Sequence, residues 1–431
     1  MKTNWQPFRQ LQTEGAYNYL TQLITLDALE VAHFEALGDE RMLAIEHKTL
    51  RLLFHEATHW LDHVSTTWGQ RSIVQIINAI NARLRNSPPD FWRIALANAE
   101  IYRIHFPKYF TTIEEGIDTE REGKPWQAQL TSGLQFGPDG RSRPDRPILF
   151  YRFKNSLGRS ICRTPISIAA LTEANATIAE SWIDLRYLQN LKEDERLLEG
   201  KLLAKASAER LYDPRLSAYS VAAHFVANKF GLEEGFTAYR LTAALGTLAL
   251  NLPPSSFHSL RVPPFVNFDG RFKAFVKQGD RGFAFVVLVT HAPPLPDEFM
   301  EGEDLRRWID QAATNAGLPN LATLDQMVRK EHENIKREII DGPESLRAHA
   351  LLDIGRRLYD RRGLYGCDVI MEPLLDDKTI VDLPPVVLGD FSLVQIGRPI
   401  KEANIANVAA WLKNADRYER EIDEFIEACM P

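Results

Sequence analysis

Two histidines four positions apart, His55 and His59, enclose a Glu-Ala-Thr stretch within a segment of strong helical periodicity, 46–64. Residues at positions i and i+4 of a helix lie one turn apart on the same face, so the two imidazole rings can converge on one tetrahedral metal ion. Ile45 and Leu52 fall on this histidine face, and the main apolar face lies opposite. We therefore predict a helix that carries two metal ligands and is covered on both sides.

Glu56 lies beside the two histidines and completes the pattern His-Glu-x-x-His. In this pattern the histidines bind Zn²⁺ and the glutamate acts as a base. Coordination to zinc lowers the pKa of water toward about 7, and a neighbouring carboxylate can take the proton as the water attacks a carbonyl carbon. The motif therefore predicts a zinc site with Glu56 as general base.

A catalytic zinc site needs a third protein ligand and an open fourth position. His63 follows on the same helix, but its Cα lies about 12 Å along the axis from that of His55, too far for both to bind one ion. A third histidine six residues after His59 is also ruled out, because that position holds Ser65. A glutamate from a separate helix is the remaining common solution. Asp62, one turn after His59, is a candidate hydrogen-bond partner of a ligand imidazole.

The best candidate for that glutamate is Glu173, in a helical segment rich in alanine, 166–191. Small residues let this helix approach the histidine helix closely, and an acid among Ala and Ile is costly to bury unless it is paired or metal-bound. Glu180 lies two turns further along the same face, either as the partner of a ligand imidazole or as the ligand itself. Glu234, which is followed by glycine and small residues, is the second alternative.

The stretch 55–59, followed by the helix that bears Glu173, resembles the gluzincin group of zinc metallopeptidases. Residues 54–62 together with 65–69 resemble a little-characterised bacterial branch of that group. The resemblance covers residues 43–250 and implies a zinc-dependent hydrolase, with His55, His59 and Glu173 as ligands and Glu56 as base. The gap between His59 and Glu173 is longer than in compact members, which indicates an insertion near the cleft.

The resemblance also implies a Tyr or His that donates a hydrogen bond to the developing oxyanion, a group that amide hydrolysis generally needs. Tyr219, His224 and Tyr239 are the candidates, and all three follow Glu173 in the chain. Tyr219 and His224 lie in an apolar stretch, where a packing role is the competing interpretation.

Two other classes of function remain open. A di-iron carboxylate oxidoreductase in a helix bundle would use two Glu-x-x-His pairs and two further glutamates, here Glu30 with His33, Glu56 with His59, and Glu173 with Glu180. A non-catalytic module would use zinc only to join two helices, while the last third of the chain binds a partner protein. Structural zinc sites usually close the fourth position with Cys or His, which disfavours this second alternative.

The predicted fold class is mainly α (α+β): a zincin-like helical metallopeptidase core with short strand insertions and a mixed C-terminal region. Breaks rich in Pro and Gly divide the chain. The predicted parts are a helical lobe with the histidine motif (1–110), a loop-and-hairpin insertion (111–165), a second helical lobe with the third ligand (166–252) and the mixed region (253–431). The apolar run 283–289 is the strongest predicted strand.

Composition limits the environment and the partners. With 51 Lys and Arg against 58 Asp and Glu, the net charge is −7, so the chain has no global attraction for nucleic acid or anionic lipid. The three cysteines are widely spaced and no apolar segment is long enough to span a membrane. We therefore expect a cytoplasmic protein that acts on a peptide or protein substrate, with no membrane partner; a regulatory protein partner stays open.

Overall fold

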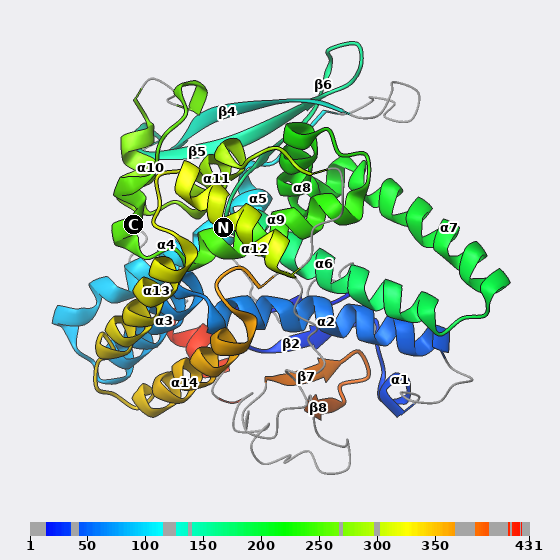
Figure 1. Ribbon diagram of the computed structural model, residues 1–431. Coiled ribbons are helices and arrows are strands. Elements are labelled where there is room, and N and C mark those ends of the chain that lie inside the picture. Colours follow the sequence, from blue (N-terminus) through cyan, green and yellow to red (C-terminus); the bar gives the residue numbers. More distant parts are fainter. Residues whose placement is uncertain are drawn as a thin grey trace.

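Helix α2 (Leu43–Ser65), which carries the two histidines, lies between elements from distant parts of the chain in the computed structural model (Figure 1). It packs against α6 on one side and α14 on another, and against strands β1 and β2. The structure describes residues 14–35, 43–114, 126–136, 140–266, 270–296, 302–366, 384–395, 413, 416–422 and 424.

Helices dominate the described residues, as predicted. They are α1 (Val31–Glu35), α2, α3 (Thr67–Leu84), α4 (Trp92–Ile104), α5 (Phe106–Phe110), α6 (Ile168–Gln189), α7 (Glu193–Leu211), α8 (Ser217–Phe230), α9 (Gly235–Asn251), α10 (Phe272–Gln278), α11 (Arg281–His291), α12 (Gly302–Asn315), α13 (Leu321–Arg337) and α14 (Ser345–Arg362). None of the helices in this part of the chain combines the length and hydropathy needed to cross a membrane.

The strands form two separate four-stranded sheets. The first has the order β1-β2-β7-β8, and the second has the order β3-β6-β5-β4. The strands are β1 (Ala16–Tyr17), β2 (Ile24–Leu26), β3 (Thr112–Ile113), β4 (Gln127–Phe136), β5 (Ser142–Lys154), β6 (Ser160–Pro165), β7 (Pro385–Leu388) and β8 (Leu393–Gln395).

The second sheet corresponds to the predicted insertion, 111–165. All of its strand pairs are antiparallel, and the long ribbon of β4 and β5 lies above the helices in Figure 1. The first sheet was not expected. Its parallel pair aligns Ile24 with Val386 and Leu26 with Leu388, so it joins two described segments that lie far apart in the sequence. Residues predicted to begin the first helical lobe therefore lie in strands instead.

The prediction of a strand over 283–289 was wrong, because these residues lie in α11. The side chain of Asp280 caps this helix by accepting a hydrogen bond from the backbone N–H of Phe283, at 2.7 Å. Every residue from Phe283 to Val289 is fully buried. A helix that is apolar on all sides has no polar face, so its sequence shows a continuous apolar run that periodicity cannot distinguish from a buried strand.

Glycine sets the distance between α2 and α14. A Cβ atom on Gly355 of α14 would come within 1.8 Å of the carbonyl oxygen of Val64, so no other residue fits at this crossing. About two turns later along α14, Arg362 reaches the core. Its guanidinium Nη2 lies 2.6 Å from the Asp62 carboxylate of α2, and both side chains are buried.

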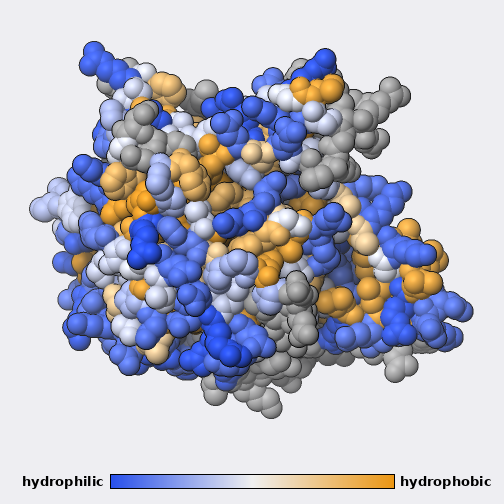
Figure 2. Space-filling view, turned by 45° about the horizontal axis from the view of Figure 1, so that its top comes forward, coloured by the Kyte–Doolittle hydropathy of each residue, from blue (hydrophilic) through white to orange (hydrophobic). Residues whose placement is uncertain are grey.

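Helix α7 projects away from the rest of the described structure together with the end of α6 (Figure 1). None of its residues is buried. In Figure 2 apolar side chains gather on this arm at the right of the view. Among the described apolar residues that are exposed, α7 contributes Leu197, Leu198 and Leu202.

Candidate metal centre

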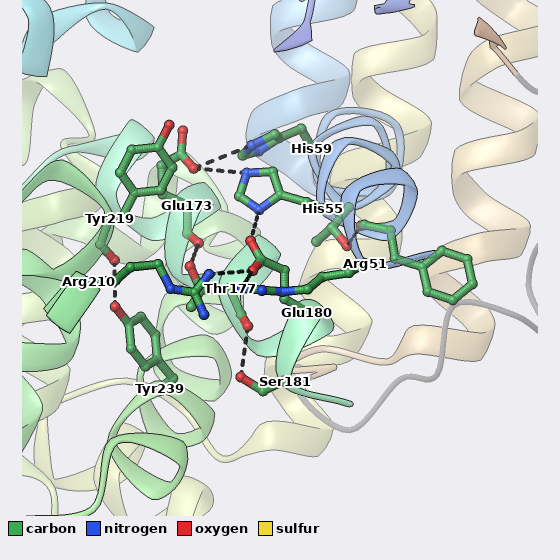
Figure 3. A network of polar contacts seen from close by, with 12 residues as sticks. Arg51, His55, His59, Glu173, Thr177, Glu180, Ser181, Arg210, Tyr219 and Tyr239 are labelled. Atoms are coloured by element: carbon green, nitrogen blue, oxygen red, sulfur yellow. Dashed lines mark hydrogen bonds and ion pairs between the residues drawn. The ribbon is translucent and has the colours of Figure 1, made fainter. Parts of the chain in front are cut away.

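Two packed helices bring the three predicted ligands together. Helix α2 presents His55 and His59, and α6 presents Glu173. Glu173 Oε2 lies 3.4 Å from His55 Nε2 and 3.5 Å from His59 Nε2. Figure 3 shows the carboxylate pointing toward both imidazole rings. Among the described residues, these three form the group whose ligand atoms, all within 4.8 Å of one another, could hold a metal ion.

The donor set fits a tetrahedral zinc ion. Zinc bonds of about 2.0–2.1 Å place two tetrahedral ligand atoms roughly 3.4 Å apart, which matches the separations of Glu173 Oε2 from the two imidazole nitrogens. Glu173 Oε2 is also buried without a hydrogen-bond partner. An unsatisfied buried oxygen is costly, and a cation between it and the two nitrogens removes that cost. His55, His59 and Glu173 are therefore the residues that could hold the metal.

Glu180 lies on the opposite side of the His55 ring. Its Oε1 is 2.6 Å from His55 Nδ1, while Nε2 of the same ring faces Glu173. Arg51, one turn before His55 on α2, donates a hydrogen bond to Glu180 Oε2, and Arg210 of α7 lies 3.2 Å from the same oxygen. Glu180 thus orients the imidazole and fixes its tautomer, and it is not itself in the ligand group.

The electrostatic environment favours a cation at this place. Burial opposes a charge on His55, but the adjacent carboxylates of Glu173 and Glu180 outweigh burial and raise its pKa well above the usual value. Burial acts against ionisation of Glu173, yet the two imidazoles lower its pKa. Both effects show that negative charge from α6 lies close to the imidazole rings, with Glu173 on the Nε2 side and Glu180 at Nδ1 of His55.

Glu56 is buried next to the two histidines, and burial raises its pKa above the usual value. A Cβ atom on Gly15, just before β1, would come within 3.1 Å of Glu56 Oε1. The chain just before the first sheet therefore lies against the carboxylate of Glu56. A carboxyl group with a raised pKa in a confined site has the properties of a general acid or base.

Tyr219 of α8 is the oxyanion-donor candidate that lies at the centre. The centroid of its ring is 6.2 Å from that of His55, and Figure 3 shows it beside Glu173. The charge of Glu173, followed by burial, raises the pKa of its hydroxyl, so the group stays protonated. Tyr239 takes a supporting position, because its hydroxyl donates a hydrogen bond to the backbone oxygen of Tyr219, at 3.2 Å.

His224 does not share this position, which corrects the expectation that it serves as a donor at the site. Its ring stacks on Trp126 within an aromatic cluster, and its Nε2 lies 2.9 Å from the backbone oxygen of Leu211. Burial lowers its pKa to about 4, so the ring is neutral. The packing interpretation holds for this residue.

Two further expectations need correction. The carboxylate of Asp62 contacts Arg362 and Asn175, and none of its described contacts is to a ligand histidine. Glu234 caps α9, accepting hydrogen bonds from the backbone N–H groups of Phe236 and Thr237. The Asp62 carboxylate is therefore occupied by residues distant in sequence, and the Glu234 carboxylate by the first turn of its own helix.

The second Glu-x-x-His pair of the di-iron alternative lies away from this group. His33 Nδ1 lies 3.0 Å from the backbone N–H of Glu30 at an exposed position on α1. His63 is separate as well: Tyr17 Oη lies 2.9 Å from its Nδ1, and burial lowers its pKa to about 3. The described residues thus provide one group of three ligands and no second one.

Several residues at the centre were missed in the sequence. Arg51 lies four positions before His55, so helical spacing alone could have indicated it. Arg210 lies on a different helix, α7, and nothing in the sequence around it indicates that it contacts Glu180. Tyr19 lies between β1 and β2, with its ring centroid 6.4 Å from that of His59, and burial raises its pKa. The unexpected first sheet brings Tyr19 to the site.

Removing the Glu180 carboxylate should weaken zinc binding without removing a ligand. We expect Glu180→Ala to lower the affinity for zinc by about 10- to 100-fold, because the His55 ring loses the partner that orients it. Competition with a chromophoric chelator measures this affinity. Glu180→Gln is the control: its amide oxygen still accepts from Nδ1–H, so the loss should be smaller. Equal affinity in wild type and Glu180→Ala would contradict the orienting role.

No family model, curated protein or solved structure matched this chain significantly. The relationship to gluzincins therefore stays a prediction that rests on the motif and the residues around it.

Proposed function

We propose that this chain is a zinc-dependent metallohydrolase with a zincin-like core, and specifically a peptidase. The observation that supports it is the pair of separations, 3.4 and 3.5 Å, between Glu173 Oε2 and the two imidazole nitrogens, with Glu56 on the same helix as the histidines. Three ligands leave a tetrahedral ion one open position, which is typical of catalytic rather than structural zinc.

Each residue of the centre has a separate role in the proposed amide hydrolysis. His55, His59 and Glu173 would hold the ion, and bound zinc supplies the Lewis acidity that activates water and polarises a carbonyl. Glu56 accepts the proton from the attacking water and passes it to the departing amine, a role that suits a buried carboxylate. The Tyr219 hydroxyl, protonated at neutral pH, donates a hydrogen bond to the developing oxyanion.

Metal content tests the ligand set. Wild-type protein purified without added metal should contain one zinc per chain, and Glu173→Ala should lose most of it, because only the two imidazoles remain. Glu234→Ala is the matched control, since this glutamate caps α9 and its loss should leave zinc in place. Inductively coupled plasma mass spectrometry gives the stoichiometry.

The outcomes separate the candidate functions. Two irons per chain would replace the proposal with the di-iron alternative, and zinc retained in Glu173→Ala would show that another residue is the third ligand. Zinc without cleavage of any member of a diverse peptide library, read by mass spectrometry, would favour the non-catalytic module. Cleavage that is lost with the metal and restored by adding zinc would support the peptidase.

A further inference from the structure

A cavity of about 260 Å³ lies between α3, α4, α10, α11 and the short helix η4 (Pro254–Ser259), and none of the three candidate metal ligands lines it. Its lining is rich in cationic side chains. Arg71, Arg103, Lys277 and Arg281 line it, against one carboxylate, Glu100. This concentration of positive charge is unusual in a chain whose net charge is −7.

Arg281 is the most unusual of these residues because it is 5% exposed and has no carboxylate within ion-pair distance among the described residues. Its Nη1 donates to the backbone oxygens of Ala249 and Leu252, which lie at the end of α9. Its guanidinium also lies over the ring of Phe257, 5.0 Å from the centroid. These contacts position the group without an ion pair. Burial, followed by the charge of Arg71, lowers its pKa to about 9, although the more distant charges of Glu100, Glu331 and Asp280 act in the opposite direction.

The other cationic side chains of the lining differ in whether they form ion pairs. Arg71 forms ion pairs with Glu331 and Glu338, and Arg103 lies 3.8 Å from Glu100. Lys277 is exposed and lines the cavity, and it forms no ion pair with another described residue. Two cationic side chains of the cavity lining, Arg281 and Lys277, are thus without an ion pair to another described residue.

Hydrogen-bonding groups in the wall are unsatisfied as well. Ser72 lines the cavity, is 1% exposed, and its Oγ has no hydrogen-bond partner. Nε of Arg71 is also buried without a partner. Buried donors that lack partners are costly, so a cavity with several of them is suited to a ligand with several acceptor oxygens.

We propose that this cavity binds the phosphate group of a small molecule. A phosphate monoester carries about −1.5 to −2 charges at pH 7 and has three strong acceptor oxygens, which match two cations that lack ion pairs and the unsatisfied donors. Arg281, held by two backbone carbonyls, offers its remaining N–H groups to the phosphate, and the exposed Lys277 adds a second positive charge from the lining. The site is independent of the zinc proposal.

Calorimetric titration of the full chain with inorganic phosphate tests the site. Sodium acetate and sodium chloride at equal ionic strength serve as reference anions, because salt screens nonspecific attraction. We expect saturable binding of phosphate alone, weakened at least about tenfold in Arg281→Gln and about fivefold in Lys277→Gln. Glycerol 3-phosphate is the second probe. Tighter binding of glycerol 3-phosphate than of inorganic phosphate would indicate a phosphate carried on a larger molecule, and the reverse order would indicate free phosphate.

Lys273→Gln is the matched control, since Lys273 is exposed on the same helix as Lys277 but does not line the cavity. Lys277→Gln changes an exposed residue, so it keeps the test valid if Arg281→Gln fails to fold. Absence of saturable binding, acetate binding as tight as phosphate binding, or equal loss of affinity in Lys273→Gln and Lys277→Gln would each overturn the proposal.

Discussion

Replacing Glu56 by glutamine is expected to lower the rate of peptide hydrolysis at least about a hundredfold while the zinc content stays at one per chain. A positioned general base contributes roughly 10²- to 10⁴-fold to a rate, and a neutral amide cannot accept the proton. Glutamine has the same shape, so the buried position beside Gly15 stays filled. The rate constant is measured on a peptide that the wild-type protein cleaves, with metal content determined on the same samples.

Two comparisons make the result specific. Glu173→Ala should lose both zinc and activity, whereas Glu56→Gln should lose only activity, which separates a ligand from a base. Glu234→Gln, which alters a helix cap, should retain both. Wild-type turnover by Glu56→Gln would eliminate Glu56 as the base, and loss of zinc in this variant would make it a ligand or a structural support instead.

Replacing Asp62 by alanine is expected to lower the free energy of unfolding by about 3–5 kcal/mol. Asp62 and Arg362 form an ion pair in which neither side chain is more than 3% exposed, so the substitution leaves a guanidinium buried without its counter-charge. Arg362 Nη2 would keep its contact with Thr247 Oγ1 at 3.2 Å, but this hydroxyl carries no charge. Denaturant unfolding followed by circular dichroism measures the change.

An exposed ion pair on the same helix provides the control. Asp353 of α14 lies 2.6 Å from Lys336 Nζ, and both side chains are substantially exposed, so Asp353→Ala should cost at most about 1 kcal/mol. The double variant Asp62→Ala/Arg362→Met removes both buried charges and should recover most of the lost stability. A double variant that is no more stable than Asp62→Ala would show that packing, and not the unpaired charge, causes the loss.

The spacing of apolar and polar residues predicted those helices in which one face is apolar and another is polar. The helix that carries the histidines and the alanine-rich helix that carries Glu173 were both predicted from spacing, and the structure contains both as α2 and α6. Periodicity failed at α11, where every side of the helix is buried. It also could not predict β1, β2 and β7, because these short strands depend on pairing between segments that lie far apart in the sequence.

At the site, too, features with a local sequence signal could be predicted, and contacts between distant residues could not. Glu173 could be singled out because an acid among small apolar residues needs a partner, and the structure brings it to the two imidazoles. The partner of Asp62 could not be predicted, because Arg362 lies on a helix far along the chain and reaches the core through a crossing that Gly355 permits. The role of His224 depends on Trp126 in the same way.

The parallel pairing of β2 with β7 has a consequence for protein synthesis. Val386 and Leu388 belong to the same buried cluster as Phe54 and Trp60 of α2. At about 5–20 residues per second, β7 leaves the ribosome roughly 20–70 s after β2. All three metal ligands are already present in the nascent chain for much of that interval, while part of the apolar surface of α2 is still uncovered. During this time the apolar residues of α2 lack the packing that β7 later supplies.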